Sequence, residues 1–397
     1  MGNRVFIAGV GMIPFSKPSA ARPYTTMGTD AIRLALHDTS IDYGDIQQVY
    51  VGYVYGDSTC GQRVAYEVGM TGIPVFNVNN NCATGSAAIY LARQAILGGI
   101  SDCTLAVGFE QMPPGAISAM YSDRPSPTGK WRTQAERKRP RPPNTPPAAH
   151  LFGSAALEYQ EIHGTKNEVF AMISAKARKH AAHNERAIFR DAITVEDVLN
   201  SAPVFGVLTR LQCCPPTCGA AAAVLVSEQF AKREGLNVDV EILSQAMVTD
   251  LPSTFGSGSA IKAVGYDMSE KAALAVYEAA GISPVDLDVC ELHDCFTANE
   301  LLSYEALHLV PPGGAERFIR NGANTYGGEI VVNPSGGLLS KGHPLGATGV
   351  AQCVELVDQI KGRCGARQVE NVRLGLQHNI GIGGACVVTA YGRAKLR

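Results

Sequence analysis

The chain has 397 residues, of which 46% are hydrophobic and 18% are charged, and its formal net charge is −2. This length exceeds the size at which one hydrophobic core usually keeps growing, so we expect two or three domains. The near-neutral charge argues against a general nucleic-acid binder and against a protein of membrane surfaces. Eleven cysteines occur without the dense spacing of a secreted disulfide scaffold, which favours a reducing compartment.

Neither end of the sequence carries a clear targeting signal. The opening MGNRVFIAGVG enters a strand pattern almost at once, and the end AKLR places Arg397 after a run close to a peroxisomal tripeptide. No apolar run is long enough to span a bilayer, so we expect no membrane insertion. The expected location is the cytoplasm, with a peroxisome or mitochondrion as the alternative for a eukaryotic source.

The chain resembles itself in widely separated segments. The segment that begins at Ala31 aligns with the one that begins at Ala272, an offset of 241 residues. The segment that begins at Ala83 aligns with the one that begins at Ala347, an offset of 264 residues. Apolar strand runs alternate with helical runs throughout, so we predict an α/β fold built from two halves of the same plan.

A third match shows that the first half contains an insertion. GAAAAVLVS from Gly219 aligns with GACVVTAYG from Gly384 at an offset of 165, so 99 extra residues precede the last strand of the first half. We therefore predict an N-terminal half at residues 1–112 and 216–236. An inserted domain follows at 113–215, and a C-terminal half at 237–397.

The inserted domain has two kinds of sequence. SDRPSPTGKWRTQAERKRPRPPNTPPAAH is rich in proline and basic residues and is expected to be loop. EVFAMISAKARKHAAHNE predicts an amphipathic helix with a basic face. We expect most basic residues of the loop to be solvated, with one or two available to a polyanionic ligand such as a nucleotide phosphate. They are Arg132, Arg137, Lys138, Arg139 and Arg141.

A cysteine stands where a strand pattern meets a helix pattern. Cys82, within NCATGS, follows the strand-like IPVFNVNN and precedes the helical SAAIYLARQAILGG. Free N–H groups and the dipole at a helix N-terminus lower a thiol's pKa and favour the reactive thiolate. The equivalent junction of the second half carries His343. Because matching helices of a doubled fold pack near its pseudo-axis, we expect Cys82 and His343 to meet, which gives a cysteine nucleophile the base it needs.

A base, an acid and a thiol lie in a row at the end of another predicted strand. His293, Asp294 and Cys295 follow DLDVCEL, a placement suited to a catalytic group or a metal ligand. A buried structural cysteine does not need this placement. We expect Asp294 to orient the loop by hydrogen bonds, and Asn299 and Glu300 to cap and start the next helix.

The segment QHNIGIGG, residues 377–384, contains glycines that allow close backbone approach and N–H groups that could serve as oxyanion donors. His378 and Asn379 are either satisfied core groups or pocket-lining groups, and we favour the first. Cys386 is expected in the core.

Three further cysteines, Cys213, Cys214 and Cys218, lie close together in CCPPTC. A metal site is one reading of this cluster. No second ligand cluster with zinc spacing accompanies it, so we predict no metal.

Four segments together, CATGS, HDCF, NPSGGLLSKGHPLGATG and NIGIGG, resemble the thiolases, specifically the sterol carrier protein-type branch of that family. The resemblance runs from about Arg4 to Tyr391. It implies a layered α-β-α-β-α core made of two βαβαβαββ halves, with a loop domain inserted in the first. It also implies thiolytic cleavage of a 3-oxoacyl-CoA to acetyl-CoA and a shortened acyl-CoA, reversible as a Claisen condensation.

The resemblance assigns roles by position. Cys82 matches the family's nucleophile, and His343 matches the histidine of its G-H-P loop. HDCF replaces the family's N-E-A-F loop and puts His293 where the asparagine stands. GIG replaces C-x-G at residues 381–383, so Cys295 is expected to supply the acid/base thiol instead. The expected oxyanion donors are the N–H groups of Cys82 and Gly383 together with His343 and His293.

The resemblance also implies coenzyme A as co-substrate, no permanently bound cofactor, no nucleic-acid partner and a homodimer or homotetramer. The strongest alternative is a thiolase-fold lyase that cleaves steroid side-chain acyl-CoA thioesters by retro-aldol chemistry with a partner protein. The retained cysteines and histidines favour the thiolase. A non-catalytic acyl-CoA or lipid carrier is a further alternative, although the sequence given contains no appended carrier segment.

Overall fold

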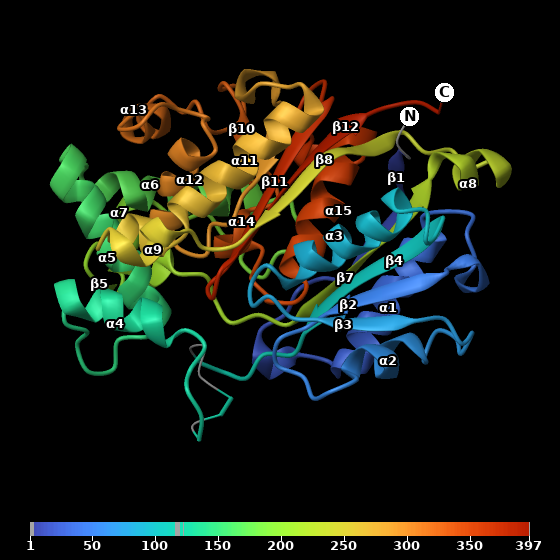
Figure 1. Ribbon diagram of the computed structural model, residues 1–397. Helices are drawn as coiled ribbons and strands as arrows, with labels where there is room; N and C mark the ends of the chain where they lie inside the picture. The colour runs from blue at the N-terminus through green and yellow to red at the C-terminus, as the bar shows by residue number, and fades with distance from the viewer. Residues whose placement is uncertain (1–3, 116–119, 122, 397) are drawn as a thin grey trace.

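The protein is described here by a computed structural model that covers residues 4–115, 120–121 and 123–396. Its ten-stranded sheet contains two groups of five strands with matching order, β3-β2-β4-β7-β1 and β10-β9-β11-β12-β8, which meet at β1 and β8 (Figure 1). The first group is β1 (Val5–Met12), β2 (Gln48–Gly52), β3 (Val75–Val78), β4 (Cys103–Glu110) and β7 (Gly219–Ser227). The second is β8 (Val240–Val248), β9 (Val289–Glu291), β10 (Val331–Val332), β11 (Leu374–Gly381) and β12 (Ala385–Arg393).

Strand directions also match between the groups. β2 pairs in parallel with β3 and β4, as β9 does with β10 and β11. β7 lies antiparallel between β4 and β1, as β12 does between β11 and β8. Within the described residues, strands β1 and β8 pair across the two groups at Phe6 and Glu241. The predicted α/β fold with two pseudo-symmetric halves is confirmed.

The helices follow the repeat that the sequence predicted. α1 (Tyr24–His37) corresponds to α11 (Tyr266–Ala280), and α3 (Thr84–Leu97) corresponds to α15 (Thr348–Lys361). The remaining helices outside the inserted region are α2 (Cys60–Ala65), α8 (Glu228–Arg233), α9 (Pro252–Gly256), α10 (Ala260–Ala263), α12 (Thr297–Ala306), α13 (Ala315–Arg320) and α14 (Gly337–Ser340). Short 3-10 turns are η1 (Pro18–Ala20), η2 (Tyr43–Asp45), η3 (Arg210–Gln212), η4 (Pro284–Asp286) and η5 (Gly365–Arg367).

Helices α3 and α15 form the central layer between the two groups of strands (Figure 1). Nearly all of α15 is buried, which is expected of a helix covered on both sides. The two helices approach most closely at Gly85 and Gly349, positions that match at the offset of 264. A Cβ at Gly349 would lie 2.1 Å from the backbone nitrogen of Ser86, and one at Gly85 would lie 2.8 Å from the carbonyl oxygen of Gly346. Glycine at both positions therefore brings the N-termini of these helices, and the loops before them, together.

The region between β4 and β7 contains α4 (Gly129–Lys138), α5 (Pro147–His163), α6 (Asn167–Ala181), α7 (Val195–Leu199), β5 (Pro203–Phe205) and β6 (Leu208–Thr209). The predicted amphipathic helix is confirmed as α6. The prediction of loop throughout the basic segment is wrong, because α4 forms within it. Trp131 and Ala135, four residues apart, are buried on one side of α4, and Trp131 packs edge-on against Phe255.

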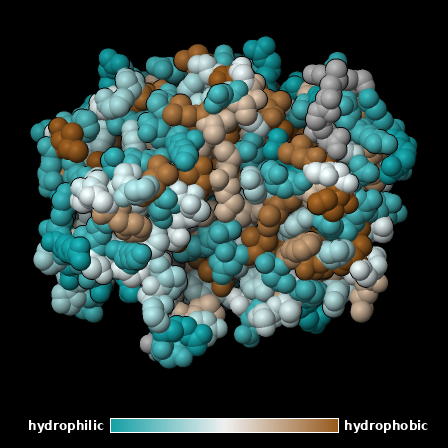
Figure 2. Space-filling model, viewed as in Figure 1, coloured by the Kyte–Doolittle hydropathy of each residue, from teal (hydrophilic) through white to brown (hydrophobic). Residues whose placement is uncertain are grey.

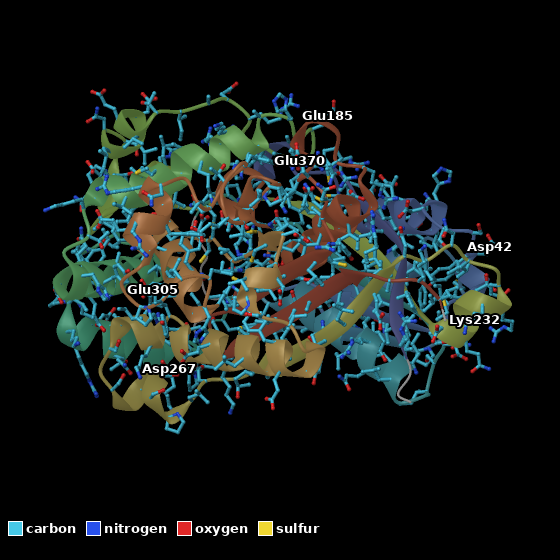
Figure 3. All side chains as sticks on the ribbon, turned by 90° about the horizontal axis from the view of Figure 1, so that it is seen from above. Asp42, Glu185, Lys232, Asp267, Glu305 and Glu370 are labelled. Atoms are coloured by element: carbon cyan, nitrogen blue, oxygen red, sulfur yellow. The ribbon has the colours of Figure 1, made fainter. Side chains whose placement is uncertain are left out.

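The face of the molecule seen in Figure 2 is mainly polar. Figure 2 shows hydrophilic side chains over much of one face, with hydrophobic ones gathered over the region of β3 and α3. Charged residues such as Asp42, Glu185 and Lys232 lie at the periphery in Figure 3, whereas Glu305 lies toward the interior. Glu305 accepts a hydrogen bond from the N–H of Gly313. Within the described residues, none of the helices has the length and apolar character needed to cross a membrane.

Candidate active site

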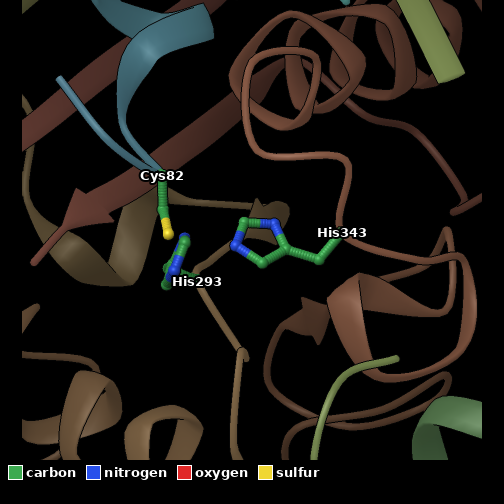
Figure 4. A group of neighbouring side chains, drawn as sticks. All are labelled: Cys82, His293 and His343. Carbon is green, nitrogen blue, oxygen red and sulfur yellow. The ribbon is translucent and has the colours of Figure 1, made fainter. Parts of the chain in front are cut away.

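Three predicted residues from three loops form one cluster. Cys82 precedes α3, His293 follows β9, and His343 precedes α15. The Cys82 sulfur and one ring nitrogen from each histidine all lie within 4.8 Å of one another, and both rings are turned toward the sulfur (Figure 4). The two imidazole rings meet edge to face, with centroids 5.0 Å apart. The expected meeting of Cys82 and His343 across the pseudo-axis is confirmed, and His293 joins them.

The predicted lowering of the Cys82 pKa is wrong. Burial, with the nearby Glu110 carboxylate as a second cause, raises the pKa of the Cys82 thiol to about 12, against a smaller opposing effect of its own backbone N–H. The first N–H groups at the helix start are already used, since those of Ala83 and Thr84 donate to the carbonyls of Asn80 and Asn81. Burial therefore keeps the Cys82 thiol neutral in this state.

The ring of His343 is oriented by a hydrogen bond between its Nδ1 and Thr348. Nδ1 lies 2.7 Å from Thr348 Oγ1, and the threonine hydroxyl donates its single proton to the Pro344 carbonyl at 3.0 Å. Thr348 must then accept from Nδ1–H, which leaves Nε2 without a proton. Nε2 is buried and has no hydrogen-bond partner among the described residues. Burial, reinforced by Lys341, lowers the pKa of His343 to about 3, so the ring is a neutral base beside the thiol.

His293 is held from the opposite side. Its Nδ1 lies 2.9 Å from Nδ2 of Asn379 on β11, and its backbone N–H points to Nδ1 of His378 at 3.5 Å. Burial, with His343 and His378 as further causes, keeps the pKa of His293 well below its usual range. His378 also bonds Ser269 Oγ at 2.9 Å. The expectation that His378 and Asn379 are satisfied buried polar groups is confirmed, and Asn379 additionally fixes a cluster residue.

Asp294 orients its loop, as predicted. Its two carboxylate oxygens accept the backbone N–H groups of Leu338 at 2.7 Å and Leu339 at 3.3 Å, at the start of α14. Burial, with Glu300 as a second cause, raises the pKa of Asp294 to about 8, against these two N–H groups. This bond ties the loop of His293 to the segment that leads to His343.

Asn299 and Glu300 lie in the first turn of the next helix, as predicted, but the prediction that they cap it is wrong. Helix α12 begins at Thr297, with Phe296 as its N-cap residue, so both side chains lie inside the helix. They are buried and serve tertiary contacts, since Asn299 donates to the carbonyl of His293 and Glu300 pairs with Lys176. Polar residues that cap a helix and polar residues buried inside one are of the same types, and burial is not visible in the local sequence.

A cavity of about 540 Å³ opens beside the cluster. Cys82, His293 and His343 line one part of it, together with Cys295. Much of the remaining lining is apolar, including Phe152, Leu339, Phe296 and Ile380. The cavity is large enough for a small organic ligand, and its character suits an apolar chain that approaches a polar reacting group.

Cys295 lies in this cavity beside a second cysteine. Cys213 and Phe296 form an antiparallel bridge, and the Cys214 N–H donates to the Cys295 carbonyl at 2.9 Å. Burial, with the thiols of Cys214 and Cys82 as further causes, raises the pKa of Cys295 well above its usual range. Cys295 is therefore a protonated thiol that faces the same cavity as Cys82.

The other cysteines singled out from the sequence are Cys213, Cys214, Cys218 and Cys386. Cys213 and Cys214 line the cavity, while Cys218 is buried with its sulfur 3.1 Å from the Met112 nitrogen. These three form no group with metal-ligand geometry within the part of the chain that the structure describes. Cys386 is fully buried on β12, as predicted for the core. All eleven cysteines are free thiols.

The glycine-rich turn between β11 and β12 packs against the Cys82 loop. A Cβ at Gly381 would lie 2.2 Å from the Asn80 carbonyl oxygen, and the Asn81 side chain donates to the Ile382 carbonyl at 2.8 Å. Gly383 is exposed on this turn and has a φ of 112°, which a side chain would strain. The turn that carries Gly383 is therefore in direct contact with the loop that carries Cys82.

The basic residues near the cavity are not those that the sequence singled out. Lys138, Arg139 and Arg141 form ion pairs with Glu158, Glu161 and Glu136. The cavity is lined instead by Arg178 of α6 and Arg210 of η3. The Arg178 guanidinium lies over the ring of Phe189, 4.3 Å from its centroid.

The sequence does not reveal every functional candidate. Its local pattern assigns Asn379 only to the core and gives Ser86, within CATGS, no role. Thr348 could have been found from the repeat, because it matches Thr84 at the offset of 264, and both hydroxyls hold the loop that precedes their helix. Arg178 lies on a helix with several basic residues, and no local signal separates it from the others.

The chain matches the thiolase N-terminal domain over residues 5–138 and a thiolase C-terminal domain-like model over residues 258–390. It is 53% identical over 393 residues to sterol carrier protein 2 of Homo sapiens, covering 98% of this chain and 72% of that protein. The chain therefore belongs to the thiolase family. It is also 34% identical over 404 residues to benzoylsuccinyl-CoA thiolase subunit BbsB of Thauera aromatica, covering 96% of this chain and 95% of that one.

Solved structures share the fold at lower identity. An Ltp2-ChsH2(DUF35) aldolase superposes with a TM-score of 0.83 at 24% identity, and covers 99% of both chains. Human mitochondrial 3-ketoacyl-CoA thiolase superposes with a TM-score of 0.75 at 18% identity, again over 99% of both chains. These likenesses extend over the whole chain and confirm the thiolase fold.

Proposed function

We propose that this protein is a 3-oxoacyl-CoA thiolase, an acyltransferase that uses CoA to cleave 3-oxoacyl-CoA into acetyl-CoA and a shortened acyl-CoA. The observation that carries the proposal is that the Cys82 sulfur lies within 4.8 Å of a ring nitrogen of His343, whose Nε2 is buried, unprotonated and without a hydrogen-bond partner among the described residues. Cys295 supplies a second thiol in that cavity. A nucleophile, its base and a separate proton donor are the three groups that the reaction needs.

The reaction starts from a neutral thiol and a neutral imidazole. As the 3-oxo carbon comes within reach, the Cys82 proton moves to His343 Nε2 and the sulfur bonds to that carbon. The carbonyl oxygen becomes an oxyanion held by the N–H groups of Cys82 and Gly383. Because the cavity is largely apolar, the charge is stabilised by fixed donors rather than by water, which is worth more in a site of low dielectric.

The second step breaks the bond between C2 and C3. The oxyanion collapses to an acyl thioester on Cys82, and the electron pair of the broken bond leaves as the acetyl-CoA enolate. The enolate oxygen accepts hydrogen bonds from His293 and from His343, which now carries the proton of Cys82. The Cys295 thiol protonates the enolate carbon, and acetyl-CoA is released.

The last step returns every group to its starting state. The thiol of a second CoA gives its proton to the Cys295 thiolate and attacks the acyl group. Cys82 leaves as a thiolate and recovers its proton from His343. Run backwards, the same transfers join two thioesters in a Claisen condensation.

We propose that the CoA phosphates bind the arginines that line the cavity. They are Arg178 and Arg210. The guanidinium group suits phosphate because it presents several donors in one plane. This places the adenosine diphosphate outward and the pantetheine arm toward Cys82.

Thiolysis of acetoacetyl-CoA and of a long-chain 3-oxoacyl-CoA tests the proposal, with wild type, Cys82→Ala and Cys295→Ala compared. We expect turnover in the wild type and loss in both variants, with Cys82→Ala losing covalent chemistry altogether. Cleavage of a 3-hydroxyacyl-CoA without CoA, unaffected by Cys82→Ala, would instead indicate the retro-aldol lyase. Binding of acyl-CoA with neither activity would indicate a carrier.

A further inference from the structure

The proton on His293 can be placed from the group that holds its ring. Asn379 Nδ2 lies 2.9 Å from His293 Nδ1. An amide nitrogen donates and does not accept, so Nδ1 of a neutral imidazole must be the accepting nitrogen. The ring proton is then on Nε2, the nitrogen left to face the cluster. His293 is therefore a donor there, whereas His343 presents a lone pair.

The direction of the Asn379 amide is itself fixed by a chain of buried groups. Gln377 Nε2 donates to the Gly349 carbonyl at 2.6 Å, which identifies it as the nitrogen because a carbonyl oxygen only accepts. The same nitrogen donates to Ser86 Oγ at 2.8 Å, and Tyr391 donates to Gln377 Oε1 at 2.7 Å. The Ser86 hydroxyl can then give its single proton to Asn379 Oδ1, 2.8 Å away. Asn379 Nδ2 is therefore turned toward His293.

The position of this proton determines whether the cluster of Cys82, His293 and His343 can bind a metal ion or instead presents an N–H donor. A thiol and two imidazoles within 4.8 Å of one another have the composition of a zinc site. A metal binds the unprotonated nitrogen of each imidazole. In metal sites the other ring nitrogen usually carries the proton and donates it to a carboxylate or a carbonyl group. Asn379 presents its amide nitrogen to Nδ1 instead. This favours the tautomer of His293 that is protonated on Nε2, so Nε2 has no lone pair for a metal.

We propose that Ser86 and Asn379 act as positioning residues that keep His293 an N–H donor and keep zinc out of the cluster. In the proposed thiolase, on which this role rests, the same proton serves the enolate oxygen. The hydrogen bonds from Ser86 to Asn379 and from Asn379 to His293 connect helix α3, which follows the nucleophile, to a histidine from the other half of the chain.

Asn379→Asp tests the proposal, because a carboxylate accepts only and reverses the bond to His293 Nδ1. The tautomer with a free Nε2 lone pair becomes favoured, so we expect the apparent affinity for Zn²⁺ to rise about 10–100-fold over wild type. Affinity is measured by competition with a chromophoric zinc indicator. Co²⁺ in place of Zn²⁺ should give the absorption bands of a thiolate-bound tetrahedral ion. Equal Zn²⁺ affinity in wild type and Asn379→Asp would overturn the proposal.

Two controls separate a local effect from a general one. Asn379→Asp combined with Cys82→Ala should return Zn²⁺ affinity to the wild-type level, because one of the three ligands is missing. Ser86→Ala frees the amide to turn, so its Zn²⁺ affinity should lie between wild type and Asn379→Asp. If Ser86→Ala matches wild type, Ser86 does not orient the amide.

A direct measurement on wild type covers the case in which Asn379→Asp does not fold. The ¹⁵N spectrum of histidine-labelled protein, assigned by comparison with His293→Gln, should place the His293 proton on Nε2. A proton on Nδ1 would overturn the inference whether or not the protein is active. An Nε2 proton without thiolysis activity would leave the inference standing and remove the proposed function.

Discussion

The ring of His343 is fixed by Thr348, whose Oγ1 lies 2.7 Å from Nδ1 and turns the unprotonated Nε2 toward Cys82. Loss of the base in His343→Ala should lower kcat/KM about 10²–10⁴-fold, the usual range for a general acid–base group. Thr348→Val removes the acceptor and leaves Nδ1–H buried without a partner, so we expect a smaller loss in kcat with little change in KM. Steady-state thiolysis rates measure both effects.

Thr348→Ser is the matched control, because it keeps the hydroxyl and removes only a methyl group. It should retain most of the wild-type rate. Equal losses in Thr348→Ser and Thr348→Val would mean that the methyl group's packing matters and that the hydroxyl does not position His343.

The pH dependence of Cys82 alkylation follows from the two opposite pKa shifts. The Cys82 pKa is raised to about 12 and the His343 pKa is lowered to about 3, so the ligand-free pair stays neutral between these values. The rate of Cys82 alkylation by iodoacetamide should therefore rise about tenfold per pH unit from pH 7 to 9 without levelling off. Peptide mapping assigns the label to Cys82. A plateau with a midpoint below pH 7 would indicate a resting thiolate–imidazolium pair and contradict the account.

Binding of the CoA phosphates should depend on the arginines that line the cavity. Arg178→Ala and Arg210→Ala should each raise the KM for CoA roughly tenfold with kcat unchanged, since each removes a charge-assisted hydrogen bond. Dephospho-CoA, which lacks the 3′-phosphate, shows which arginine meets that group. Arg137→Ala is the comparison from the basic segment and should leave KM unchanged. A raised KM in Arg137→Ala alone would restore the assignment favoured by the sequence.

A buried ion pair supports the loops of both histidines. Lys341, two residues before His343, lies 3.3 Å from Glu291, two residues before His293, and both side chains are almost fully buried. Lys341→Met leaves the carboxylate buried without its cation, so the free energy of unfolding should fall by about 3–5 kcal/mol. Chemical denaturation measures this change.

The loss should also depend on pH. Burial raises the pKa of Glu291, and removing the nearby cation raises it further. A carboxyl whose folded-state pKa is raised contributes stability below its unfolded pKa and loses it as pH rises through the folded value. Lys341→Met should therefore be less destabilised at pH 5 than at pH 8, and Lys341→Met with Glu291→Gln should recover part of the loss. Equal destabilisation at both pH values would mean that lost packing, not the unpaired charge, is the cause.

The edge of the sheet offers a surface for the expected homo-oligomer. β3 is the last strand of the first group, and Phe76 on it is 44% exposed. Figure 2 shows hydrophobic side chains gathered over the region of β3 and α3. Unpaired strand edges with apolar side chains favour association. Light scattering after size exclusion should give a dimer or larger for wild type and a smaller species for Phe76→Lys. A wild-type monomer would contradict the expectation.

The repeat and the junction residues could be predicted from the sequence because they depend on short segments. The offsets of 241, 264 and 165 found the matching elements, and strand-to-helix junctions identified Cys82 and His343. A doubled fold brings such junctions together whatever the detailed packing. The thiol of Cys295 could be placed for the same reason, since it lies directly after β9.

Properties that depend on burial or on contacts between the halves could not be predicted. The sign of the Cys82 pKa shift depends on complete desolvation and on Glu110, which lies 28 positions further along the chain. The role of Asn379 depends on Ser86, which is 293 residues away in the sequence. Asn299 and Glu300 carry ordinary cap chemistry, and only the packing around α12 shows that they lie inside it.

The covalent intermediate on Cys82 is the most direct test of the central claim. Wild-type protein is mixed with a 3-oxoacyl-CoA in the absence of free CoA, quenched with acid, and its intact mass and peptides are measured. We expect an added acyl group, two carbons shorter than the substrate's acyl chain, on the peptide that contains Cys82, and its loss when CoA is added. Turnover of the same substrate without any acyl adduct on Cys82, or an adduct on Cys295 instead, would contradict this expectation.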